Sequence, residues 1–184
     1  IVYDCVQFPR RGWVHRNRVE FGSGLEWVTL PLNKCSRNTN ICDLVFRDDI
    51  DLWSELTINK LKTIVGQNVF EWSLLRPKGS VVDYLIDTMT WCGNSLGVST
   101  KLIRSSSLQV DKKLKSQDRV IELCRTVGAT QYFNLPGGTA LYERESFSSV
   151  GIDLSFLTPF DGSFESVLGR FLKEPKADII KEIS

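Results

Sequence analysis

The chain has 184 residues, with 23 basic and 22 acidic side chains and a formal net charge of +1. A chain of this length fits one domain, with a hydrophobic core large enough to need no disulfide. The near-neutral balance excludes a protein that grips long stretches of nucleic acid through general attraction to phosphates, although it is compatible with a local anion site.

The first third of the chain is predicted to be mostly β. Residues 1–8 are rich in β-branched and aromatic side chains, and residues 13–21 alternate with a period of two. A glycine-containing turn follows at 22–24, and residues 25–30 return as a second strand. The sequence therefore predicts a β-hairpin behind an N-terminal strand.

The rest of the chain mixes strand and helix signals. The expected elements are a strand over 41–46, a helix over 52–65 that ends at Gly66, a helix over 81–96, a strand over 98–103, a helix from Leu114 to Gly128 and a strand over 130–135. The strand–helix–strand order from 98 to 135 predicts a right-handed βαβ unit. We therefore predict an α/β fold, a single domain with an N-terminal β-hairpin region and a partly parallel sheet flanked by helices.

Cysteine usage and hydropathy bound the cellular setting. The five cysteines form no CxxC pair, and the chain has one histidine as a further metal ligand, so we expect reduced thiols rather than a structural zinc site. No apolar stretch approaches the roughly 18 residues that cross a bilayer, and no signal peptide is recognisable. We expect a cytoplasmic protein without a membrane span.

The densest cluster of chemically active side chains lies in the predicted hairpin, where four arginines and the only histidine fall within nine residues. In an extended strand, His15 and Asn17 share the face of Trp13, whereas Arg16 and Arg18 project from the opposite face. One face can then hold a base, and the other can clamp a phosphate or a carboxylate. A surface hairpin with solvated arginines and a structural histidine fits the same pattern, so both interpretations stay open.

Other candidate motifs are less specific. Gly137 and Gly138 follow a predicted strand and can present backbone N–H groups to an anion, but Pro-Gly-Gly is also an ordinary turn. The acidic residues between Asp48 and Asp51 precede a helix, which favours capping and dipole compensation over a Mg²⁺ site. The serine run 105–107 lacks a nucleophile elbow and does not indicate a hydrolase.

Several motifs resemble those of the WbqC-like protein family. The distinctive opening block consists of Tyr3-Asp4-Cys5-Val6-Gln7-Phe8, Gly12-Trp13, Arg16-Asn17-Arg18 and Trp27-Val28-Thr29-Leu30-Pro31. Later segments follow in the family's order, namely Leu96-Gly97-Val98, Ser105-Ser106, Gly128-Ala129-Thr130-Gln131-Tyr132, Gly137-Gly138, Leu141-Tyr142, Phe147 and Gly151-Ile152. The resemblance covers nearly the whole chain.

The resemblance implies a role in the synthesis of O-antigen or a related bacterial surface glycan. The reaction that it implies is transfer of a glycyl or other acyl group from an acyl donor onto an amino sugar, which we expect to be nucleotide-linked. Family members usually begin with a segment that contains His-Gln-Pro and Tyr-Leu-Pro elements. We therefore expect residues 1–184 to form one WbqC-like domain that lacks this N-terminal segment. The resemblance does not identify a cofactor.

Acyl transfer to an amine needs a base, donors for the oxyanion and a clamp for the diphosphate of the sugar nucleotide. With this chemistry in view, Asp4 and His15 are the candidate catalytic residues, in base or orientation roles. The candidate ligand-binding residues are Arg16 and Arg18 for the clamp, Gly137 and Gly138 in support of it, and Gln7, Asn17 and Tyr142 for the sugar. We expect the two motif blocks to converge on one cleft, since such sites gather at the ends of strands.

A protein of another class fits the same residues. It is a non-catalytic protein of the same pathway that binds the sugar nucleotide or assists assembly, in which the arginines hold the ligand and no base is needed. A nucleic-acid-binding module would need a larger basic surface than this chain has.

Overall fold

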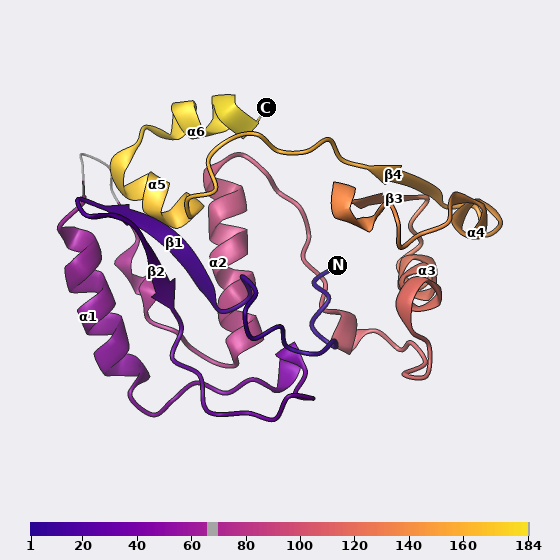
Figure 1. Ribbon diagram of the computed structural model, residues 1–184, viewed down its shortest axis with the longest axis horizontal. Helices are drawn as coiled ribbons and strands as arrows, with labels where there is room; N and C mark the ends of the chain where they lie inside the picture. Colours follow the sequence, from indigo (N-terminus) through magenta and orange to yellow (C-terminus); the bar gives the residue numbers. More distant parts are fainter. Residues whose placement is uncertain (66–69, 184) are drawn as a thin grey trace. The chain divides into compact units, whose positions relative to one another are not determined.

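The computed structural model describes residues 1–65 and 70–183, which form helices, strands and short 3-10 turns (Figure 1). The chain divides into two compact units, one with residues 1–103 and 162–184 and the other with residues 104–161. Both units contain helices and strands, which confirms the predicted α/β class. The single-domain prediction stays a prediction. In the described part of the chain, no helix is both long enough and apolar enough to cross a membrane.

An antiparallel hairpin forms the sheet of the first unit. β1 (Arg16–Phe21) pairs with β2 (Gly24–Thr29) along its whole length. Gly24 closes the turn with a φ of 111°, a conformation that glycine adopts without strain. Val19 and Phe21 are buried while the residue between them is exposed, so the predicted alternation is confirmed for the strand itself. The strand begins later than the sequence pattern indicated.

Helices surround this hairpin. Those of the first unit are α1 (Ile50–Lys62), α2 (Val81–Ser95), α5 (Val167–Lys173) and α6 (Lys176–Ile183), with the 3-10 turns η1 (Ile41–Asp43) and η2 (Trp72–Leu75). α2 begins at a capping box, in which the Asp83 N–H donates to the Ser80 hydroxyl at 3.1 Å and the Ser80 N–H donates to the Asp83 carboxylate at 3.3 Å. The predicted helices over 52–65 and 81–96 are confirmed, with slightly different ends. The expected helix end at Gly66 lies outside the described residues.

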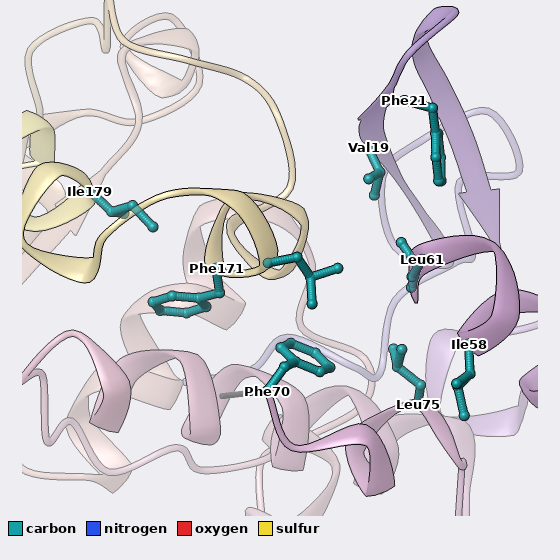
Figure 2. Close-up of a cluster of buried hydrophobic side chains, with 9 residues drawn as sticks. Val19, Phe21, Ile58, Leu61, Phe70, Leu75, Phe171 and Ile179 are labelled. Atoms are coloured by element: carbon teal, nitrogen blue, oxygen red, sulfur yellow. The ribbon is translucent and has the colours of Figure 1, made fainter. Parts of the chain in front are cut away.

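The main core of the first unit is built from the hairpin, α1, η2, α5 and α6 (Figure 2). Its buried members are Val19, Phe21, Ile58, Leu61, Phe70, Leu75, Phe171, Leu172 and Ile179. Trp91 of α2 packs edge-on against this core, with ring centroids 5.5 Å from Phe70 and 5.3 Å from Phe171. Burying an apolar side chain of this size contributes about 1.5–3 kcal/mol. The core therefore holds the helices against the inner face of the hairpin.

Three segments that the sequence predicts as strands are not strands. Residues 1–8 contain bends and isolated bridge residues, residues 98–103 have no regular structure, and residues 41–46 begin with the 3-10 turn η1. An isolated antiparallel bridge between Gln7 and Asn40 takes the place of the expected pairing in the first of these segments. The strands predicted over residues 1–8, 41–46 and 98–103 are therefore wrong.

In the segments 1–8 and 41–46, apolar residues pack into a core instead of pairing as strands. Phe8 and Leu44 are buried in a small second core of the first unit, together with Val81 at the start of α2. β propensity largely reflects how well a side chain fits a half-buried surface, so apolar, β-branched segments that pack in this way mimic strands in a sequence.

The second unit contains a parallel pair of strands. Its elements are η3 (Ser105–Ser107), α3 (Ser116–Thr126), β3 (Gln131–Asn134), η4 (Pro136–Gly138), α4 (Arg144–Ser148) and β4 (Asp153–Phe156). β3 and β4 pair in parallel, and α4, which lies between them in sequence, packs against β4. The predicted α3 and β3 are confirmed. The βαβ unit is therefore β3–α4–β4, and its expected position over residues 98–135 is wrong because residues 98–103 are not a strand.

The second unit has a core of its own. Its buried members are Val120, Cys124, Phe147, Ile152 and Leu154. Phe147 has an exposed fraction of 0%, and its ring stacks on Tyr132 with centroids 5.4 Å apart. This core and the cores of the first unit share no buried residue.

Candidate functional site

The first unit contains a cavity of about 890 Å³, which we call the apolar cavity. Its wall is formed by the N-terminal segment, the hairpin, α1, η2, α2 and residues 163–172, all of which belong to this unit. Most of the side chains are apolar, among them Val19, Leu30, Trp53, Phe70, Met89 and Leu172. A volume within about 300–1,000 Å³, with a few polar groups on an apolar wall, is typical of a small-molecule site.

The apolar cavity brings together part of the predicted site. The predicted residues on its wall are Asp4, His15, Arg16 and Asn17. Gln7 belongs to the same unit but is exposed, and its Nε2 donates to the Arg37 carbonyl oxygen at 2.7 Å. The Asn17 side chain is fixed locally, since its Oδ1 accepts a hydrogen bond from the Arg18 N–H at 2.9 Å.

Asp4 is almost fully buried, with an exposed fraction of 1%. Its N–H donates to the Val2 carbonyl oxygen at 3.0 Å, and its own carbonyl oxygen accepts from the Cys42 N–H at 2.9 Å. Burial, the Asp43 carboxylate and the Asp4 carboxylate, in that order, raise the pKa of the Cys42 thiol. A buried carboxylate on a cavity wall can orient other groups or take part in proton transfer.

His15 combines a fixed backbone with an incompletely paired ring. Its carbonyl oxygen accepts from the Leu30 N–H at 2.8 Å, and its ring meets Phe8 edge-on, with centroids 5.0 Å apart. Nδ1 is shielded from solvent and has no hydrogen-bond partner among the described residues. Burial and, second, the Arg16 charge lower the pKa of His15, so the ring is neutral at pH 7 and can accept a proton.

The guanidinium groups of Arg16 and Arg18 lie over tryptophan rings on the outer face of the hairpin. Arg16 Cζ is 4.3 Å from the centroid of Trp27, and Arg18 Cζ is 5.1 Å from Trp13 and 5.8 Å from Trp27. We call these four residues the arginine–tryptophan face. Because Arg18 is directly opposite Trp27 in the β ladder, this face lies opposite the buried side of the strand.

Two details of the arginine–tryptophan face differ from, or add to, the sequence-based prediction. Trp13 does not share the face of His15, because it precedes β1 and its ring packs on Trp27 at 4.9 Å. Arg16 is tied to the preceding loop, since its Nε donates to the Gly12 carbonyl oxygen at 3.1 Å and its Nη2 donates to the Arg11 carbonyl oxygen at 2.9 Å.

A second cavity of the first unit, of about 620 Å³, is lined by basic side chains, and we call it the basic cavity. Arg10, Lys34 and Arg47 lie on its wall, and no acidic residue is found among the described residues that line it. The residues that line both cavities are His15, Leu30 and Trp53. The chain's only histidine thus borders an apolar space and a basic one.

The remaining predicted residues belong to the second unit. Gly137 is exposed in η4, whereas Gly138 is buried and lies so close to Asn134 that a Cβ there would be 2.5 Å from the Asn134 Nδ2. Tyr142 packs its ring edge-on against Phe147, with centroids 5.9 Å apart. The expected convergence of these residues with Asp4 and the arginines on one cleft stays a prediction.

At the start of α1, the predicted dipole compensation is present, but Asp49 does not cap the helix through its side chain. Asp49 occupies the N-cap position without a side-chain capping hydrogen bond and pairs with Arg47, while Asp51 lies in the first turn, where a carboxylate offsets the helix dipole. In the described residues, no group of three or more His, Cys, Asp or Glu side chains is placed to hold a metal ion. All five cysteines are free thiols.

The sequence model of the WbqC-like protein family matches residues 1–174. The chain belongs to this family. The uncharacterized protein Rv1507c of Mycobacterium tuberculosis is 24% identical to this WbqC-like protein over 202 residues, which span 98% of this chain and 80% of that relative. No solved structure matches the chain.

The basic cavity of this WbqC-like protein was not predicted from the sequence. Arg10 belongs to the arginine cluster, but Lys34 and Arg47 lie in segments without periodicity. Their juxtaposition depends on loop pairing, because the Arg47 N–H donates to the Pro31 carbonyl oxygen at 2.9 Å and an isolated bridge joins Leu32 to the residue before Arg47. A single sequence carries no signal for such a contact.

Proposed function

We propose that this WbqC-like protein transfers a glycyl or other acyl group onto the amino group of a nucleotide-linked sugar, in the synthesis of a bacterial surface glycan. The observation that carries the proposal is the position of His15, whose neutral ring borders both the apolar and the basic cavity. One cavity has a mostly apolar wall and the other has basic side chains on its wall, so the two cavities suit two substrates of different polarity and charge. The motif resemblance to the family supports the glycan context.

In the proposed reaction, the amine nitrogen of the sugar attacks the carbonyl carbon of an activated acyl group. A C–N bond forms, and the bond from that carbon to the oxygen or sulfur of the leaving group breaks. The proton released by the amine passes to the neutral imidazole of His15 and then to the leaving group. A lowered pKa supports this role because the ring starts the reaction unprotonated.

The other residues take supporting roles in the proposal. The buried carboxylate of Asp4 lies on the same cavity wall and favours the positive charge that His15 gains during proton transfer. Arg16 and Arg18 clamp the diphosphate in this proposal, because the planar fork of N–H donors on a guanidinium group matches phosphate oxygens. The proposal also keeps the sugar contacts that the sequence analysis assigned to Gln7, Asn17 and Tyr142. It likewise keeps Gly137 and Gly138 as backbone donors in support of the clamp.

A non-catalytic protein that binds the sugar nucleotide or assists assembly is the second candidate. Two observations favour it. Asp4 is buried as a structural carboxylate would be, and the Arg16 guanidinium group is already bonded to two backbone carbonyl oxygens. In such a protein the same cavities hold a ligand, and His15 transfers no proton.

The two candidates are separated by an assay of turnover. The protein is incubated with nucleotide-linked amino sugars and with activated donors, namely glycyl and acyl thioesters or glycine with ATP, and mass spectrometry detects the N-acylated sugar nucleotide. We expect at least one combination of sugar nucleotide and donor to give a product. His15→Gln should reduce the rate of product formation by about 10²–10⁴-fold, the usual contribution of a general base.

Binding of the sugar nucleotide, measured by calorimetry, should survive in His15→Gln. A protein that binds sugar nucleotides and gives no product with any donor is the assembly protein of the second candidate. Undiminished turnover in His15→Gln would remove the role assigned to the histidine.

A further inference from the structure

We propose that the basic cavity is an anion site of its own, distinct from the arginine–tryptophan face, and that it binds the phosphate groups of a ligand through Arg10, Lys34 and Arg47. The proposal goes beyond the transferase, because binding at this site does not require turnover. If the transferase holds, the ligand is the phosphate-bearing end of the acyl donor, and this last step rests on the proposed function.

The charges on the cavity wall carry the proposal. Arg10, Lys34 and Arg47 line the same cavity, and no acidic residue is found among the described residues of its wall. Lys34 makes no ion pair or hydrogen bond through its side chain in the described part of the chain, so its ammonium group is available. The carboxylate of Asp49 partly neutralises Arg47 through an ion pair. Arg10 donates one N–H to the Cys35 carbonyl oxygen. Each guanidinium group has five N–H donors, so donors remain on both arginines.

The site is held in place before any ligand arrives. The Arg47 N–H is bonded to the Pro31 carbonyl oxygen, and the Asn33 N–H is bonded to the Val45 carbonyl oxygen, both at 2.9 Å. These bonds fix the segment that carries Lys34 against the segment that carries Arg47. A site whose backbone is already fixed loses less conformational entropy when it binds an anion than one whose segments must first be ordered.

The rest of the wall fits the remainder of a phosphate-bearing molecule. Phe8, Leu30 and Trp53 supply apolar surface beside the charges, and the volume of about 620 Å³ exceeds what a bare phosphate needs. Arg10, Lys34 and Arg47 are themselves exposed, so a ligand can reach their charged groups from solvent. The cavity therefore suits a phosphate group joined to an apolar or aromatic moiety.

The test uses inorganic pyrophosphate as the probe, in titration calorimetry at fixed ionic strength. We expect binding to the wild-type chain and a loss of affinity of about tenfold or more in Lys34→Gln and in Arg47→Gln, which corresponds to one charge-assisted hydrogen bond. Matched controls are Lys112→Gln, an exposed lysine of the second unit, and Arg125→Gln, an exposed arginine that pairs with Glu122 as Arg47 pairs with Asp49. Both controls should bind as the wild type does.

Arg18→Gln separates this site from the arginine–tryptophan face, because pyrophosphate binding that depends on Lys34 and Arg47 should survive this substitution. If pyrophosphate binding is lost in Arg18→Gln but kept in Lys34→Gln and Arg47→Gln, the anion site is on the outer face and the inference is overturned. It is equally overturned if no binding is detected or if all variants bind alike. Circular dichroism of each variant checks that the fold is intact. Failure of the transferase assay with pyrophosphate binding retained would contradict the proposed function alone.

Discussion

His15 is the residue on which most of the chemistry depends. It is the chain's only histidine, it borders two cavities and its Nδ1 is buried without a partner among the described residues. An unpaired buried polar atom costs about 1–3 kcal/mol, a cost that a contact with a bound ligand can offset. The same ring is neutral at pH 7, which is the protonation state that a base requires.

The lowered pKa of His15 predicts a pH dependence of stability. Since the folded-state pKa lies below the unfolded value of about 6.5, the unfolded chain binds more protons between these two values. Stability should therefore fall as the pH falls from about 6.5 through the folded-state pKa, and no further loss from this residue is expected below it. His15→Gln should remove this part of the slope in urea unfolding between pH 7.5 and 5.

The ionisation itself is open to direct measurement, because one histidine gives one imidazole signal in NMR. The titration of this signal should give a pKa below the ordinary value. A midpoint at or above about 6.5 would contradict the lowered pKa of His15 and the neutral ring that the proposed base requires.

At the scale of elements, local patterns predicted the helices and the hairpin but did not show which apolar segments pair as strands. The hairpin could be predicted because an alternating pattern and a glycine turn lie next to each other in sequence. The segments 1–8 and 98–103 were mistaken for strands because β-branched and apolar residues favour a strand locally, although such residues do not require a partner strand. β4 is four residues long and was not predicted, so the true parallel partner of β3 was missed.

The same distinction applies to the candidate site. Asp4, His15, Arg16 and Asn17 could be grouped because they are close in sequence, and all four line the apolar cavity, while their functional roles stay a prediction. The basic cavity was missed because loop contacts assemble it from distant segments.

The turn η4 offers a matched pair of substitutions that tests its packing. A Cβ at Gly138 would lie 2.5 Å from the Asn134 Nδ2 and 3.3 Å from the Tyr142 ring, whereas a Cβ at Gly137 would meet nothing within 4 Å. Neither glycine has a positive φ. Gly138→Ala should therefore lower the unfolding free energy by about 1–3 kcal/mol through overpacking. Gly137→Ala should be neutral or slightly stabilising.

Urea unfolding followed by circular dichroism measures both variants. Equal stability of the two would show that Asn134 moves aside at little cost, although its Oδ1 accepts a hydrogen bond from the Leu135 N–H at 2.7 Å. If Gly137→Ala were the more damaging change, the exposed glycine would have a role that its open surroundings do not explain.

At the scale of the whole molecule, the separate cores of the two units bear on whether the chain unfolds in one cooperative transition. The core around Phe147 and the core around Phe171 share no buried residue and belong to different units. Domains unfold as cooperative units when a contiguous core holds them together. Two interpretations can therefore be compared. In one, the whole chain unfolds as the single domain predicted from its length, and in the other, the two units unfold separately.

The tryptophans allow these possibilities to be told apart, since all five lie in the first unit. Tryptophan fluorescence therefore reports the first unit, while far-ultraviolet circular dichroism reports the helices of both. Phe171→Ala and Phe147→Ala are matched truncations of buried rings, each expected to cost about 3–5 kcal/mol in its own unit. We expect Phe171→Ala to lower the fluorescence midpoint in urea, and Phe147→Ala to lower only a circular dichroism transition. Coincident shifts of both probes in both variants would instead show one cooperative domain over the whole chain, as the chain length predicts.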